Sequence, residues 1–377
     1  MRSARANGPR CGFVRNESGK RLAWGQAAHG VASRTTRARR SYAALLIGRE
    51  MCAMRMRNLG GTGLKVTELG FGGGAIGGLY SPVPRETALE AMQAAWDAGM
   101  RYFDTAPFYG HGLSERRVGD FLRDKSEYVL STKVGALLRP VPREEVPDNG
   151  FFEPLPFAVD FDYSHDAIMR SVEQSFQRLG LNRIDVLYVH ALERGTLGET
   201  YEAHLHTFLS SGIKAMERLR AAAVISGWGL GVNEVEPCLS VMEETRLDCL
   251  LLANRYTLLD RRAESQLMPR CLAQGTGVVI GGVFNSGILA MGAVPGAHFD
   301  YADALPDIAE RVRGLEAVAV AQGGTLAAAA LHFALRHDAV SSVVIGSAKA
   351  SSLARNVALL GDGTDWDWER FEAFVLR

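Results

Sequence analysis

Short apolar runs alternate with segments of helical periodicity from about residue 57 to about residue 360. Runs such as 278–280 and 343–345 are apolar on successive residues, which is typical of strands covered on both faces of a sheet. Strands are expected at 66–71, 101–103, 128–134, 185–190, 225–232, 249–253, 277–283 and 340–345. Helices are expected at 86–98, 115–123, 165–179, 211–222, 236–244, 262–274, 307–322, 326–336 and 351–360.

The alternation itself indicates the fold class. Repeated strand–helix units imply a parallel sheet, and eight of them close most naturally into a (β/α)8 barrel, the TIM barrel. A doubly wound open sheet is the structural alternative. Its dinucleotide-binding turn carries Gly-x-Gly-x-x-Gly after the first strand, and the glycines of 70–74 lack this spacing. We therefore predict an α/β fold with one barrel domain over residues 54–377.

Composition narrows the range of partners. The chain has 377 residues, of which 47% are hydrophobic, and its formal net charge is zero. Such a chain gives no indication of a nucleic-acid groove or a basic membrane surface, and no uninterrupted apolar stretch is long enough to span a bilayer. The five cysteines are scattered and lack metal-ligand spacing, so we expect reduced thiols, a cytoplasmic protein and no metal. The sequence leaves the oligomeric state open.

Residues 1–53 differ from the rest of the chain because they contain ten arginines against two glutamates. This composition fits an organelle transit peptide, a disordered arm, or translated upstream sequence with the working start at Met54 or Met56. We favour the last two interpretations and treat the segment as an extension outside the barrel.

A long proline-rich segment, 135–163, follows the third expected strand. Its five prolines argue against a helix, and its length exceeds an ordinary barrel connection. We expect it to cover the substrate and to contribute aromatic side chains such as Phe151, Phe152 and Phe157. A solvated insertion without substrate contact is the alternative.

Four polar residues lie at or just after the ends of three successive expected strands, namely Asp104, Tyr109, Lys133 and His190. In a (β/α)8 barrel the carboxyl ends of the strands form the active site. A carboxylate, a phenol, an amine and an imidazole at this edge suit proton transfer to a carbonyl oxygen. Each has an ordinary explanation alone: a turn cap, a loop aromatic, a surface lysine and a core histidine.

These positions lie in motifs that resemble the aldo-keto reductases, namely FDTAPFYG with Glu115, STKVG and VH. Other stretches, including GFGGGAIGGLY, GLGVNEVE and NRYTLLD, are similar to the branch of L-fucose and D-threo-aldose dehydrogenases and pyridoxal 4-dehydrogenases. The resemblance implies a catalytic tetrad in which Tyr109 carries the proton and Lys133 favours its phenolate form. It also implies that Asp104 holds the lysine and that His190 binds the substrate oxygen.

The resemblance further implies a nicotinamide cofactor, NAD or NADP, whose carboxamide is bound by Asn233. The pyrophosphate is expected after the seventh strand, at Phe284, Asn285, Ser286, Gly287 and Leu289, where backbone N–H groups bind phosphate oxygens. The adenosine is expected along the last strand and helix, at Gly346, Ser347, Lys349, Ser352, Arg355 and Asn356. Ordinary helix N-capping is the alternative role of Ser351 and Ser352.

The chain departs from the family pattern at three places. The tyrosine that usually stacks on the nicotinamide falls at Gly281 or Gly282, and the usual carboxamide-binding glutamine falls near Ala253. The basic residues that often hold a 2′-phosphate fall at Ala348 and Ser352. Because a missing guanidinium weakens phosphate recognition, we expect NAD rather than NADP, although Lys349 and Arg355 remain nearby.

The expected activity is oxidation of an aldose hemiacetal, such as that of L-fucose, to a lactone. Oxidation of the hemiacetal of pyridoxal is the nearest alternative. A regulatory barrel that binds cofactor with little turnover, similar to the barrel-type potassium-channel subunits, is the alternative from another class.

Overall fold

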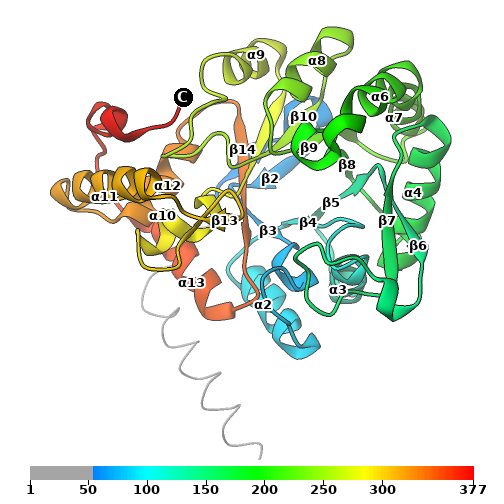
Figure 1. Ribbon diagram of the computed structural model, residues 1–377, viewed down its shortest axis with the longest axis horizontal. Helices are drawn as coiled ribbons and strands as arrows, with labels where there is room; N and C mark the ends of the chain where they lie inside the picture. Colours follow the sequence, from blue (N-terminus) through cyan, green and yellow to red (C-terminus); the bar gives the residue numbers. More distant parts are fainter. Residues whose placement is uncertain (1–53) are drawn as a thin grey trace, which may run out of the picture. The chain divides into compact units, whose positions relative to one another are not determined.

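The computed structural model describes residues 54–377, and the interpretations offered for residues 1–53 lie outside it. Eight parallel strands form a closed barrel with the order β10-β11-β14-β3-β4-β5-β8-β9 (Figure 1). They are β3 (Leu69–Gly72), β4 (Tyr102–Asp104), β5 (Val129–Val134), β8 (Val186–His190), β9 (Gly227–Val232), β10 (Cys249–Ala253), β11 (Gly277–Gly281) and β14 (Val340–Gly346). The predicted (β/α)8 barrel is confirmed.

Helices surround the barrel (Figure 1). The longer ones are α2 (Arg85–Asp97), α3 (Leu113–Leu122), α4 (His165–Leu179), α7 (Ile213–Ala221), α8 (Glu236–Glu244), α9 (Leu267–Gln274), α11 (Pro306–Ala321), α12 (Leu326–Leu335) and α13 (Ala350–Ala358). Short helices α5 (Arg194–Leu197), α6 (Tyr201–Thr207) and α10 (Ile288–Met291) lie in the connections. A serine or threonine begins α4 and α12, where the Ser164 and Thr325 side chains accept backbone N–H bonds.

Two expected elements begin or divide differently from the prediction. The expected helix 262–274 starts only at Leu267, because Asp260 holds the preceding residues in a turn by accepting bonds from the backbone and side chain of Arg262. The expected first strand splits at residue 68. Its first half, β2 (Lys65–Thr67), pairs antiparallel with β1 (Met56–Asn58), and its second half is β3.

The β1–β2 hairpin lies beneath the barrel. Leu59 and Val66 pack with the side chains that point into the barrel, and the N–H of Gly61 donates to the carbonyl of Asp248 before β10. This end of the barrel is therefore filled by the hairpin, which leaves the opposite end, where the strands terminate, for a site.

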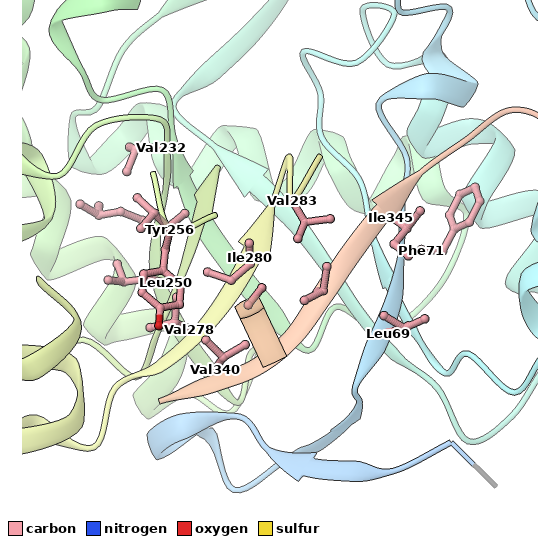
Figure 2. Close-up of a cluster of buried hydrophobic side chains, with 14 of the residues drawn as sticks. Leu69, Phe71, Val232, Leu250, Tyr256, Val278, Ile280, Val283, Val340 and Ile345 are labelled. Atoms are coloured by element: carbon pink, nitrogen blue, oxygen red, sulfur yellow. The ribbon is translucent and has the colours of Figure 1, made fainter. Parts of the chain in front are cut away.

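Side chains on the strands alternate between two cores. Tyr102, Val186 and Cys249 point inward with the barrel-filling cluster, whereas Phe103 and Leu250 point outward against the helices. Figure 2 shows part of the outward cluster, with Leu69, Phe71, Val232, Leu250, Val278, Ile280, Val340 and Ile345 on strands and Tyr256 and Val283 in the connections after β10 and β11. Each fully buried side chain of this kind contributes about 1.5–3 kcal/mol.

The proline-rich segment forms a hairpin rather than an irregular loop. Strands β6 (Ala136–Pro140) and β7 (Phe157–Phe161) pair antiparallel, and the prolines lie in the connection between them or at its edges. An isolated bridge joins Leu79 to Phe151, so the connection is tied to the loop after β3.

Three cysteines of the described region, Cys238, Cys249 and Cys271, are free and buried. Within residues 54–377 there is no group of three or more histidine, cysteine or acidic side chains that could hold a metal ion. No single helix of this region is long and apolar enough to cross a membrane; only α11 and α12, bent by 90° at their junction, pass that criterion as a pair.

Candidate active site

The alternation of β-strand side chains brings three of the predicted residues to one place. Alternate side chains of a strand point into the barrel, and Asp104, Lys133 and His190 occupy such inward positions. All three lie near the carboxyl ends of the adjacent strands β4, β5 and β8. Tyr109 comes from the loop after β4. Its ring lies beneath Nζ of Lys133, 4.6 Å from the ring centroid, and 5.6 Å from the imidazole of His190. The structure therefore brings all four residues together.

Lys133 and Asp104 form a buried ion pair. Nζ of Lys133 donates to Oδ2 of Asp104 at 2.6 Å and to the carbonyl of Thr105 at 2.9 Å. Both side chains are almost inaccessible to solvent, at 1% and 3%. The carboxylate raises the pKa of the Lys133 amine, so the amine stays protonated although burial opposes its charge.

Two opposing effects act on the pKa of Tyr109. Burial raises the pKa of its phenol, the ammonium of Lys133 lowers it, and burial has the larger effect. The contribution of the lysine has the expected direction, but the net pKa of Tyr109 lies above its ordinary value. In this state the phenol is therefore an acid that keeps its proton at neutral pH.

His190 is a neutral imidazole. Burial, and then the charge of Lys133, lower the pKa of its ring well below the ordinary value. The carbonyl of His190 accepts a hydrogen bond from the hydroxyl of Tyr163 at 2.8 Å, which holds the end of β8. A neutral ring has one N–H to donate, and this suits a hydrogen bond to a substrate oxygen.

A cavity of about 630 Å³ opens above Tyr109, Lys133 and His190. One wall is aromatic and comprises Phe108, Phe151 and Phe161. The rings of Phe151 and Phe161 both pack against Phe108, with centroids 5.6 and 6.1 Å from it. The hairpin segment thus contributes to the site as expected, with a difference in its members.

Of the three phenylalanines expected from this segment, only Phe151 lines the cavity. Phe152, its neighbour, is 49% exposed because successive residues of an extended chain point to opposite sides. Phe157 lies at the start of β7 and faces the outer groove between α3 and α4. Phe161, which was not expected, reaches the cavity from the other end of β7.

The polar wall of the cavity centres on Asn233, at the end of β9. The carboxylate of Glu193, only 2% exposed, accepts bonds from the backbone N–H of Asn233 and, at 2.9 Å, from its side-chain amide. The amide orientation is thereby set, with Oδ1 left to accept from Asn254 at 3.4 Å and from Tyr301 at 3.1 Å. Burial raises the pKa of Glu193.

Tyr301 belongs to residues 292–305, here called the strap, which connects α10 to α11. The strap contains the short strands β12 (His298–Phe299) and β13 (Ala302–Asp303). Its turn is held by Arg255, whose guanidinium donates to both carboxylate oxygens of Asp300 at 2.9 Å. Because Arg255 is nearly buried, this bidentate pair anchors the strap at the cavity.

A second cavity of about 340 Å³ adjoins the first and extends between the ends of β3, β11 and β14. Seven of its lining residues are glycines, which let a ligand approach the backbone closely. A Cβ placed on Gly74 would lie 4.0 Å from Cζ of Tyr109, so any longer side chain there would enter the space before the phenol. A groove with these glycines in its lining, which also includes Tyr109, suits a dinucleotide.

The predicted cofactor residues after β11 divide into two groups. Phe284, Ser286 and Gly287 line the groove. Asn285 is fully buried, and its side chain bonds Thr257 and the carbonyl of Asn254, while Leu289 packs in the core. The backbone N–H groups of Asn285, Gly287 and Leu289 already donate to carbonyls within this turn.

Around α13, Gly346 lines the groove, whereas Lys349 and Arg355 are exposed. Arg355 donates to the hydroxyl of Ser352 at 3.0 Å. The hydroxyl of Ser347 bonds the backbone of Lys349, so this serine shapes the turn before the helix. The remaining member of the set, Asn356, is partly buried on α13.

Several residues of the site escaped the sequence reasoning. Glu193 carried a usable signal, since an acid three residues after a strand-ending histidine lies at the rim of a barrel. No such signal exists in the sequence for Arg255, Asp300 and Tyr301, because their role depends on a contact between segments about 45 residues apart. Tyr301 lines both cavities and lies near the position left without an aromatic at Gly281 and Gly282.

Comparison with known proteins adds independent information. Residues 68–374 match the Aldo/keto reductase family. The chain is 46% identical to pyridoxal 4-dehydrogenase of Microbacterium luteolum, over 81% of this chain and 92% of that protein. It is 36% identical to D-threo-aldose 1-dehydrogenase of a Pseudomonas species, over 78% and 89%. A solved aldo-keto reductase from Bacillus halodurans shares the fold, with a TM-score of 0.68 at 23% identity, over 86% of this chain and 97% of that one.

Proposed function

The chain belongs to the aldo/keto reductase family, a family of oxidoreductases, and from this premise we propose that it oxidises a cyclic hemiacetal to a lactone. The observation that carries the proposal is the cavity above Tyr109 and Lys133, which adjoins a glycine-lined groove suited to a nicotinamide dinucleotide. A bound nicotinamide would accept the hydride from the hemiacetal carbon.

Side chains of the protein transfer the proton and stabilise the groups that carry it. Tyr109 takes the proton of the hemiacetal hydroxyl as its phenolate, and the carbon–oxygen double bond of the lactone forms. The ammonium of Lys133 stabilises that phenolate, and Asp104 holds the ammonium in place. The neutral ring of His190 donates to the substrate oxygen and orients it. In the reverse reaction Tyr109 returns the proton.

The aromatic wall favours pyridoxal over an aldose as substrate, which reverses the order expected from the sequence. A sugar needs several free hydrogen-bonding partners, whereas Glu193 is engaged with Asn233, and Arg255 with Asp300. A flat pyridine ring can instead pack against Phe151 and its neighbours. The resemblance to pyridoxal 4-dehydrogenase supports the same order.

NAD remains the preferred cofactor in this proposal, because Ala348 and Ser352 replace the basic residues usually associated with a 2′-phosphate. Lys349 and Arg355 make no ion pair within residues 54–377, so the alternative, NADP, would find its counter-charge there. Initial rates with each nucleotide decide between them.

A substrate panel tests the proposal. Oxidation rates of pyridoxal, L-fucose and D-threo-aldoses with NAD or NADP are measured for the protein and for the Phe151→Ala variant. Phe152→Ala, which changes the neighbouring exposed side chain, is the matched control. We expect the highest kcat/KM for pyridoxal, a loss of roughly tenfold or more in Phe151→Ala from lost apolar contact, and little change in Phe152→Ala.

Other outcomes have defined meanings. If kcat/KM is higher for an aldose than for pyridoxal, and Phe151→Ala does not lower it, the preferred substrate is the aldose. A shift in melting temperature on adding nucleotide, without turnover of any substrate, would support the regulatory barrel instead.

A further inference from the structure

Two tyrosines lie inside the barrel, where branched aliphatic residues usually fill the space. Tyr102 and Tyr188 are fully buried among Val129, Val186 and Cys249. The neighbouring strand makes room for them: a Cβ on Gly231 would lie 3.1 Å from the Cβ of Tyr188. Two phenol groups in a dry core require hydrogen-bond partners, and they find them in each other and in one serine.

The bonds form a chain that ends on the catalytic carboxylate. The hydroxyl of Tyr188 lies 3.0 Å from that of Tyr102, which lies 3.0 Å from Oγ of Ser131. Oγ of Ser131 donates to Oδ1 of Asp104 at 2.7 Å. The other oxygen of Asp104 accepts from Lys133. The lysine and the hydroxyl chain therefore bind opposite oxygens of one carboxylate.

The chemistry of the groups sets the direction of the chain. An ionised carboxylate has no hydrogen to donate, so Ser131 must give its single hydrogen to Asp104. Ser131 then accepts from Tyr102, and Tyr102 accepts from Tyr188. Burial keeps the pKa of both phenols well above the ordinary value, so both stay protonated donors. All three dipoles point toward the negative charge, which makes the bonds mutually reinforcing.

We propose that Ser131, Tyr102 and Tyr188 are positioning residues that keep Asp104 ionised and so keep Lys133 charged beside Tyr109. Burial favours the neutral form of Asp104, and the bonds from Lys133 and Ser131 oppose it. Without the hydroxyl chain, the buried pair moves toward a neutral acid and a neutral amine. This inference rests on the proposed role of Lys133 in activating Tyr109, but its test is independent of substrate.

Other groups act on the same carboxylate and enter the interpretation of any titration. Those facing the pair or its hydroxyl chain from the surrounding elements are Tyr109 after β4, His190 on β8, the phenols Tyr102 and Tyr188, and the thiol of Cys249 on β10, which faces the two phenols. Only the ammonium of Lys133 among them carries a positive charge at neutral pH, so loss of a neutral donor changes the balance at Asp104 directly.

The experiment follows the carboxyl carbon of Asp104 by 13C NMR as pH is lowered, in protein labelled at aspartate, with the signal identified by Asp104→Asn. We expect the Asp104 pKa to rise by about one unit in Ser131→Ala, the size expected for one lost bond to a charged group. A smaller rise is expected in Tyr102→Phe and the smallest in Tyr188→Phe, in order of distance from the carboxylate. Ser131→Thr, which keeps the hydroxyl, should restore the original titration.

Tyr201→Phe is the matched control, because it also removes a buried phenol oxygen, one without a partner and outside the barrel interior. It should leave the Asp104 titration unchanged. An unshifted Asp104 pKa in Ser131→Ala, or equal shifts in Tyr102→Phe and Tyr201→Phe, would overturn the inference. If the shifts occur but no hemiacetal is oxidised by the unmodified protein, the positioning chain stands and the proposed function fails.

Discussion

The floor of the site and its rim are held in place by different means. The floor consists of Asp104, Ser131, Lys133 and His190, which lie on barrel strands with backbones bonded on both sides. The polar side chains of Asp104 and Lys133 are fully buried and paired with each other. In this part of the molecule each charge depends on its partner, because solvent cannot reach the buried pair and take the partner's place.

The rim consists of the strap and the turn after β11. Asp300 and Tyr301 have positive φ angles of 52° and 68°, and Asn285 and Ser286 of 43° and 57°. Such conformations are uncommon outside glycine and are held by surrounding contacts. Tyr301 is half exposed, and its contacts to Asn233 and Ser286 are single hydrogen bonds.

The difference teaches where substitutions should act. A change in the floor removes a partner from a buried charge, so it should damage stability and chemistry together. A change in the strap alters side chains that water can reach, such as Asp300 and Tyr301, so it should affect the binding of ligands while the barrel remains intact.

The largest expected effect is that of Lys133→Met. Removing one member of a buried ion pair costs about 3–5 kcal/mol of stability, and loss of the ammonium removes the stabilisation of the Tyr109 phenolate. Urea unfolding and kcat measure the two effects. Tyr109→Phe is the comparison: it should lose about 10²–10⁴ in kcat with unfolding nearly unchanged. Equal stability of both variants would contradict the expected contrast between the buried charge of Lys133 and the neutral phenol of Tyr109.

The pH dependence should follow the raised pKa of Tyr109. Oxidation requires the phenolate, so kcat for oxidation should increase about tenfold per unit as pH rises toward that pKa. Reduction requires the protonated phenol, so it should stay level over this range and decline only as pH rises beyond that pKa. Initial rates in both directions, with buffers of constant ionic strength, measure the two profiles. Parallel profiles in both directions would show that another group carries the proton.

The smallest expected effect is at the rim. Asp300→Ala removes the bidentate partner of Arg255 and releases the strap, while Asp260 at 3.4 Å still balances the arginine. We expect KM for the nucleotide or substrate to rise several-fold, with kcat and the unfolding midpoint little changed. Asp303→Ala, on the exposed part of the same strap, is the control. A loss of stability as large as that of Lys133→Met would remove the distinction between rim and floor.

The local sequence pattern was sufficient to predict the parts of the site that lie on the barrel strands. Apolar runs predicted the eight strands, with bounds that differ from the observed ones by up to three residues. They also placed Asp104, Lys133 and His190 at one edge of the barrel, since parallel strands bring their ends together. The role proposed for Tyr109 came from the family resemblance. The cavity wall did not follow from the sequence: Phe151 and Phe152 are adjacent and chemically identical, but Phe151, which forms a bridge with Leu79 after β3, is the one that lines the cavity.

The sequence alone determined the barrel, its strand order in outline and the polar residues at the strand ends, because alternation and spacing are properties of neighbouring residues. The tertiary structure decided the contacts between distant segments: Arg255 with Asp300, Glu193 with Asn233, and the hydroxyl chain from Tyr188 to Asp104. Such contacts depend on barrel closure and loop paths, which place residues far apart in the chain within hydrogen-bonding distance.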